Sequence, residues 1–125
     1  MNTDTLEQPI IAEKLYDMAQ LEAMASGSQE FLISLSKIFL QTIPPNSSDM
    51  VQYAKSGNWD MTSKLAHKLK STIDGMNINS IKTIIRTIEL DAKNKKNTDT
   101  LYSLTFKVDK VIQTVAEQLK QAYDL

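Results

Sequence analysis

Apolar residues recur every three or four positions along most of the chain, a spacing that places them on one face of a helix. The pattern predicts helical stretches over about 17–25, 29–42, 46–55, 59–74 and 98–123, and another that begins between 77 and 80 and ends near 92. Pro44 and Pro45 stand between the second and third stretches, where we expect them to break or kink the helix.

Short polar turns separate the other stretches, so successive helices should pack antiparallel. We therefore predict an all-α fold, an antiparallel up-down four-helix bundle with a short extra N-terminal helix and a Pro-kinked arm. Residues 1–15 are mostly polar and include Pro9, so we expect them to form a flexible N-terminal arm. The bundle domain would then span 16–125. Ser28 and Asn58 are expected to cap two of its helices.

The composition excludes several classes of function. Lys and Arg number 14 against 15 Asp and Glu, so the chain lacks the basic excess typical of nucleic-acid binding. Cysteine is absent, which removes disulfides, thiolate metal sites and cysteine nucleophiles. No apolar run approaches the roughly 20 residues of a membrane span, and the acidic N-terminal region does not resemble a signal peptide. We therefore expect a cytoplasmic protein.

His67 is the only histidine, and helical geometry predicts which way it points. At 100° per residue, Leu65 and Leu69 fall about 160° away from it on either side. The side chains within about 60° of His67 are all polar or charged. They are Asp60, Ser63, Lys64, Lys70, Ser71 and Asp74. The imidazole is therefore expected on a polar, solvent-exposed face and not in the core.

The segment LAHKLKSTIDGMNINSI, from Leu65 to Ile81, resembles the signature of histidine phosphotransfer (HPt) domains. In that signature an alanine-histidine pair is followed by leucine two residues after the histidine and by lysine three residues after it. Ala66, His67, Leu69 and Lys70 match these positions. The segment 16–44 resembles the lead-in helices of the family, and the SGNWD turn at 56–60 resembles the loop that opens its histidine helix.

The resemblance implies that the domain over 16–125 carries a phosphoryl group between receiver aspartates. His67 would be the nucleophile, through Nε2. Lys70, about one turn further, would offset the charge of the phosphoryl group. In the family a Gln or Glu about 22 residues after the histidine often orients the imidazole, and Glu89 stands at that position here. An exposed charge on an amphipathic helix is an equally good interpretation of Glu89.

The family also implies that a receiver docks on the face around His67. The residues expected to contact it there are Lys64, Lys68, Ser71 and Asp74. Ser71 departs from the signature, which normally has glycine four residues after the histidine, and its hydroxymethyl group would narrow the choice of receiver or slow transfer. Apolar rim residues should add to this surface, with Met24, Leu32 and Ile78 as candidates.

The expected partners are response-regulator receiver domains and a hybrid sensor histidine kinase. The sequence has no glycine-rich phosphate loop and no kinase motif, so we expect a phosphocarrier without kinase activity of its own. No cofactor or metal is expected, and Mg²⁺ would be needed only in the partner receiver. We further expect a monomeric, free-standing protein that binds neither nucleic acid nor membrane.

Three other functions were weighed against phosphotransfer. The main alternative is a helical adaptor that binds a receiver or another signalling protein through the same face without carrying phosphate. A metal site is disfavoured because Asp60 and Asp74 lie two helical turns to either side of His67, about 10 Å along the helix axis. A hydrolase would need a cleft and oxyanion donors, which serines on the same helix as the histidine do not supply.

Overall fold

A computed structural model describes residues 13–125 of the chain, and that part is all-helical, without strands. Its elements, in chain order, are α2 (Ala19–Met24), α3 (Gln29–Lys55), α4 (Trp59–Gly75), the 3₁₀ turn η1 (Asn79–Ile81), α5 (Lys82–Asn94) and α6 (Thr98–Tyr123). The predicted all-α class is confirmed. The predicted helical stretches correspond to these elements, apart from the division expected in α3.

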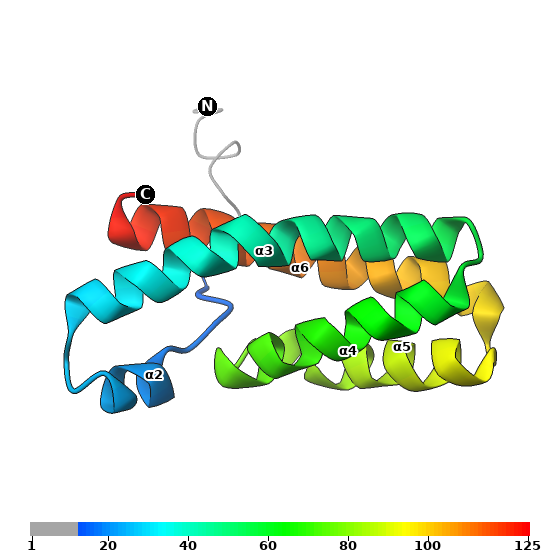
Figure 1. The fold of residues 1–125 in the computed structure, drawn as a ribbon, viewed down its shortest axis with the longest axis horizontal. Helices are drawn as coiled ribbons and strands as arrows, with labels where there is room; N and C mark the ends of the chain where they lie inside the picture. The colour runs from blue at the N-terminus through cyan, green and yellow to red at the C-terminus, as the bar shows by residue number, and fades with distance from the viewer. Residues whose placement is uncertain (1–12) are drawn as a thin grey trace, which may run out of the picture.

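The long helices lie in two layers (Figure 1). α3 packs along α6, and α4 packs along α5, with further contacts from α3 to α4 and from α5 to α6. The colours of Figure 1 show that each long helix runs opposite to the one before it. The short α2 lies apart from them, near the start of α3 and the end of α4.

The core is built from the apolar faces that the sequence pattern predicted. On α5, for example, Ile85, Ile88 and Ala92 are fully buried, one turn apart. The fully buried large side chains are Met18, Met50, Leu69, Ile73, Ile78, Ile81, Ile85, Ile88, Leu101, Val108, Ile112 and Leu119. α3, α4, η1, α5 and α6 all contribute buried residues to this one cluster, and the partly buried Leu21 of α2 packs against it. Since each buried CH₂ contributes about 0.8 kcal/mol, this core supplies the main stabilisation of the helix arrangement that carries the site.

Of the break or kink expected at Pro44 and Pro45, the break is wrong, because α3 continues through both prolines as one helix of 27 residues. In Figure 1 the first part of α3 runs at an angle to the rest. A proline in a helix interior removes one backbone hydrogen bond and bends the helix, but it does not have to end it. Packing on both sides holds the helix together here, since Ile43 is buried before the proline pair and Met50 after it.

Residues 1–12 of the predicted N-terminal arm lie outside the described residues. The last residues of the arm run along α6, where Gln118 accepts a hydrogen bond from the backbone N–H of Leu15 at 3.0 Å and donates one to the carbonyl of Glu13 at 2.8 Å. The backbone N–H of Asp17 then donates to the carbonyl of Met76 at 2.8 Å. These bonds attach the start of the domain to α6 and to the end of α4.

α4 begins and ends as its sequence predicts. The side chain of Asn58 accepts a hydrogen bond from the backbone N–H of Met61 at 3.2 Å, which caps the first turn. Ser28 caps α3 in the same way, through the N–H of Phe31 at 3.3 Å. With its register fixed by this cap and by fully buried Leu69, α4 presents a defined stripe of side chains toward α5 and solvent.

Candidate functional site

His67 lies in the middle of α4 and projects into solvent, with 69% of its side chain exposed. Ala66 and Leu69, one residue before and two after, are fully buried. The predicted outward orientation of the histidine is therefore confirmed. It follows directly from helix periodicity, because the buried leucine stripe must lie on the opposite side of α4.

Glu89 on α5 joins the histidine and the lysine of the motif. Its Oε2 lies 2.6 Å from Nδ1 of His67, and its Oε1 lies 2.7 Å from Nζ of Lys70. One carboxylate therefore bridges two side chains that are three residues apart on α4. The predicted contact between Glu89 and His67 is present, whereas the contact with Lys70 was not foreseen.

The electrostatics of this cluster favour an ionised Glu89. The hydrogen bond from Lys70 is the main cause that lowers the pKa of the Glu89 carboxyl below its ordinary value. Burial opposes this effect, and the weaker hydrogen bond with His67 also lowers the pKa. An ionised carboxylate can only accept hydrogen bonds, so Nδ1 of His67 must carry the hydrogen in this contact. In the neutral ring, the lone pair then lies on Nε2.

Nε2 of His67 has no hydrogen-bond partner among residues 13–125. Since Nδ1 faces Glu89 and the two ring nitrogens point in different directions, the unshared electron pair of the neutral ring on Nε2 points away from Glu89, in a side chain that is 69% exposed. This arrangement suits a nucleophile that has to meet an electrophile carried by another molecule. The side chain is held at one nitrogen and open at the other.

Ser63, one turn before His67, makes a third contact with Glu89. Its Oγ donates a hydrogen bond to the backbone carbonyl of Glu89 at 3.0 Å, and the bond is partly buried. The sequence placed Ser63 on the face of His67 but suggested no role for it. The four-residue spacing from the histidine was the only signal available, since the partner lies 26 residues away.

Three of the four residues expected to bind a partner are exposed, and the fourth forms an ion pair within the domain. Lys64 and Lys68 are exposed on either side of His67. Ser71 is exposed as well, and its Oγ donates to the carbonyl of Lys68 at 3.3 Å. Asp74 is instead paired with Arg86 of α5, with 2.6 Å between Oδ2 and Nη2. That contact lowers the pKa of the Asp74 carboxyl and engages one of its oxygens within the domain.

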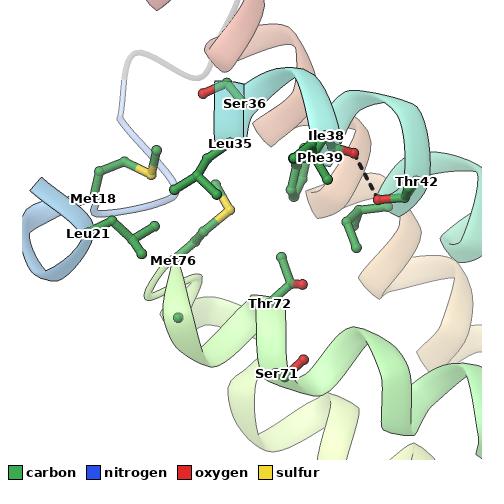
Figure 2. Close-up of a pocket in the computed structure, with 12 residues that line it drawn as sticks. Met18, Leu21, Leu35, Ser36, Ile38, Phe39, Thr42, Ser71, Thr72 and Met76 are labelled. Carbon is green, nitrogen blue, oxygen red and sulfur yellow. Dashed lines mark hydrogen bonds between the residues drawn. The ribbon is translucent and has the colours of Figure 1, made fainter. Parts of the chain in front are cut away.

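An apolar hollow of about 250 Å³ opens between α2, α3 and the last turns of α4 (Figure 2). Its walls include Leu21, Leu35, Ile38 and Met76, whose side chains Figure 2 shows around the opening. Ser71 also lines it, so the hollow begins one helical turn from His67. The site therefore combines a polar cluster and an apolar surface that meet at Ser71.

Two of the three apolar rim candidates were wrong. Leu32 is 3% exposed and Ile78 is fully buried, so both belong to the core, whereas Met24 is exposed. Ile38, which was not among the candidates, is 56% exposed and lines the hollow. The apolar stripe of α3 is wider than the face that α4 and α6 can cover, and its edge stays open to solvent.

Within residues 13–125 no group of three or more His, Cys, Asp or Glu side chains could hold a metal ion. No helix in the same range has the length and apolar character needed to cross a membrane. In comparisons with known proteins, no family model, no curated protein and no solved structure matches the chain. A function therefore has to be argued from the geometry and chemistry of the site itself.

Proposed function

We propose that the chain is a histidine phosphotransfer protein, which accepts a phosphoryl group on Nε2 of His67 from one receiver aspartate and gives it to another. The observation that carries this proposal is the exposed imidazole whose Nδ1 is bonded to an ionised carboxylate. That contact keeps the lone pair of the neutral ring on Nε2, on the side that faces solvent. An arbitrary surface histidine has no need of such a partner.

In the proposed step, the lone pair on Nε2 attacks the phosphorus of a receiver acyl phosphate in line. The N–P bond forms as the P–O bond to the aspartate breaks, and the aspartate leaves as a carboxylate with the electron pair. The phosphorylated ring carries positive charge, which is shared with the Nδ1–H bonded to Glu89. The carboxylate at 2.6 Å therefore stabilises the product ring without removing its proton.

Lys70 supplies positive charge next to this step. In the unphosphorylated protein its Nζ is held 2.7 Å from Glu89, and its side chain is 30% exposed. The phosphoryl oxygens would compete with Oε1 of Glu89 for this ammonium group, because both are anionic acceptors. We propose that Lys70 turns partly toward the phosphoryl group while exposed Lys64 and Lys68 add a weaker attraction for the incoming acyl phosphate.

We further propose that receivers dock over His67 and the apolar hollow together. Partner surfaces of this kind usually combine an apolar centre with a polar rim, and the hollow and the lysines of α4 supply these two parts. Ser71 would lie between them, in contact with the partner. Asp74 would contribute through its ion pair with Arg86 and not as an open carboxylate.

We also propose that residues 16–125 form an up-down four-helix bundle, with α2 as the extra helix and a bend in α3. The successive antiparallel helices, with α3 packed on α6 and α4 on α5, support this arrangement. We propose a monomeric phosphocarrier in the cytoplasm, where receivers and a hybrid sensor kinase would meet it. It would use no cofactor of its own and have no kinase activity.

An adaptor without phosphotransfer is the second candidate, and the hollow together with Ser71 favours it. An apolar surface can bind a receiver without any chemistry at His67, and a hydroxymethyl group hinders close approach to the imidazole. In that case the cluster around Glu89 would only hold α4 against α5. The two candidates differ in whether phosphorus ever becomes bonded to Nε2.

Incubation with phosphorylated receivers separates the two candidates. We expect an acid-labile, alkali-stable phosphoryl adduct on the wild-type protein and none on His67→Gln. A His67→Gln, Gln41→His double variant is the matched control, because it moves the histidine to an exposed position on α3. Labelling of His67→Gln would remove His67 from the mechanism. Binding of receivers without any labelling of the wild type would leave the adaptor.

A further inference from the structure

Three side chains of α4 converge on a single residue of α5. Ser63, His67 and Lys70 follow one another at spacings of four and three, so they form one stripe on the helix. Each of them contacts a different oxygen of Glu89: the backbone carbonyl at 3.0 Å, Oε2 at 2.6 Å and Oε1 at 2.7 Å. The phosphotransfer proposal uses two of these contacts, and the contact with Ser63 has no place in it.

We infer that Ser63 is a positioning residue, whose hydroxyl fixes the backbone of Glu89 so that the carboxylate can orient the imidazole of His67. This inference rests on the proposed function for its consequence, since an oriented ring matters only if Nε2 reacts. The orientation itself is a property of the unphosphorylated domain. It can therefore be measured without any phosphoryl transfer.

The geometry explains why a backbone bond matters here. Glu89 must reach two partners at once, and its side chain has three rotatable bonds through which the carboxylate could drift into solvent. Ser63 acts on the main chain, where it limits the rotation and sliding of α5 relative to α4 at this level of the bundle. Ser63 and Glu89 are both only half-buried, so packing alone holds them less firmly than it holds the leucines and isoleucines below.

The hydrogen bonds accepted by the backbone carbonyl of Glu89 also support a positioning role for Ser63. The carbonyl of Glu89 lies inside α5, where one lone pair is used by the helix itself, and the hydroxyl of Ser63 takes the second. The hydroxyl crosses from one helix to the next, unlike those of Thr87 and Ser71, which bond carbonyls of their own helices. A serine needed only for helix solubility would have no reason to bond across the interface.

The test measures the tautomer of His67 by ¹⁵N NMR in the full-length, unphosphorylated protein. In the wild type the Nδ1–H form should dominate the neutral ring. In Ser63→Ala we expect the ratio of the Nε2–H form to the Nδ1–H form to rise roughly threefold, as expected when part of one hydrogen bond is lost. Ser63→Thr keeps a hydroxyl and should restore the wild-type ratio. Thr87→Ala is the matched control, because it removes a hydroxyl that bonds only within α5.

Phosphorylation by phosphoramidate provides an independent measurement. In that reaction Nε2 attacks phosphorus, the P–N bond of the reagent breaks and ammonia leaves. Ser63→Ala should be labelled about threefold more slowly than the wild type and Ser63→Thr at the wild-type rate. If the wild type is never labelled but Ser63→Ala still shifts the tautomer, the proposed function fails and the positioning role stands.

An unchanged tautomer ratio in Ser63→Ala would overturn the positioning role. The conclusion does not depend on the stability of the variant. A loss of thermal stability without a tautomer shift would mean that Ser63 only packs α4 on α5. Alanine favours helix more than serine does, so the variant should remain folded and the measurement can be made.

Discussion

The polar cluster at Glu89 and the apolar hollow lie next to each other on one face of the molecule, but they are built in opposite ways. In the cluster, three side chains of α4 are bonded to one residue of α5, and each contact is short and directional. The hollow is lined by apolar side chains of α2 and α3 and of the residues next to α2 and α4, with small polar residues between them, and among the apolar ones Ile38 is the most exposed. Ser71 borders both regions.

The difference indicates a division of labour between the two regions. A bonded cluster on two packed helices can hold an imidazole in one orientation, which chemistry requires. An open apolar surface has little directional preference, but it gains free energy when a partner covers it. Changes in the cluster should therefore alter the reaction at His67, whereas changes in the hollow should alter the affinity for a partner.

The largest effect is expected from Glu89→Ala. The loss of a hydrogen-bonded partner behind a metal-ligating histidine typically costs about 10- to 100-fold in metal affinity or activity, and we expect a loss of similar size in the rate of transfer from a receiver. Glu89→Gln keeps an acceptor oxygen for Nδ1–H and should retain more activity. Transfer rates under single-turnover conditions measure both variants. Equal rates for alanine and wild type would show that the carboxylate does not assist the reaction.

A charge placed in the hollow should lower the affinity for a receiver and should not alter the orientation of His67. Ile38 is 56% exposed, so Ile38→Asp should leave the fold and its stability nearly unchanged. It would place an uncompensated carboxylate in an apolar surface, and we expect the affinity for a receiver to fall about tenfold or more. Calorimetric titration with a receiver measures this. Ile38→Val is the conservative control, and equal binding by all three proteins would mean that receivers dock elsewhere.

The contrast between the two regions also describes what the sequence could predict. Helix boundaries, the orientation of His67 and the core face of α5 follow from periodicity and capping, which are local properties. The contact of Glu89 with His67 could be predicted only from the resemblance to the HPt family, in which the orienting residue stands about 22 residues after the histidine. Its contacts with Ser63 and Lys70 depend on the rotation of α5 against α4, which a single sequence does not encode in any local signal.

The wrong predictions, which concern the prolines of α3 and two of the apolar rim residues, also come from tertiary packing. Proline propensity predicted a break or a kink in α3, and the helix stays continuous because burial of its apolar residues, such as Ile43 and Met50, outweighs the loss of backbone hydrogen bonds. Leu32 and Ile78 were expected at the apolar rim, whereas the packing of the helices buries both of them in the core. Tertiary packing decided the outcome in both cases, and propensity alone could not predict it.

Ser71→Gly tests the border between the two regions and should have a moderate effect. Glycine in a helix interior costs about 1 kcal/mol in the free energy of unfolding, which a thermal or urea melt can measure. Removal of the hydroxymethyl group should let a receiver approach His67 more closely, so we expect transfer to speed up a few-fold despite the lower stability. Ser71→Ala separates the effect of the hydroxyl from that of the backbone. Slower transfer in the glycine variant would mean that Ser71 contributes to docking.

The smallest effect is expected on the stability of the fold when the pH is lowered, and it tests the charge of Glu89. Because the pKa of Glu89 is lowered in the folded domain, chiefly by Lys70, its carboxylate stabilises the fold above the ordinary value of 4.5. That contribution is lost as the pH falls below 4.5 and through the lowered pKa, where the carboxylate is protonated. Asp74 responds in the same direction through Arg86, so a fall in the stability of the wild type alone does not identify Glu89. The difference between wild type and Glu89→Gln removes this background. We expect the difference in melting temperature between the two proteins to be largest near neutral pH and to disappear in acid. A difference that stays constant down to pH values well below 4.5 would contradict an ionised Glu89 that bridges His67 and Lys70.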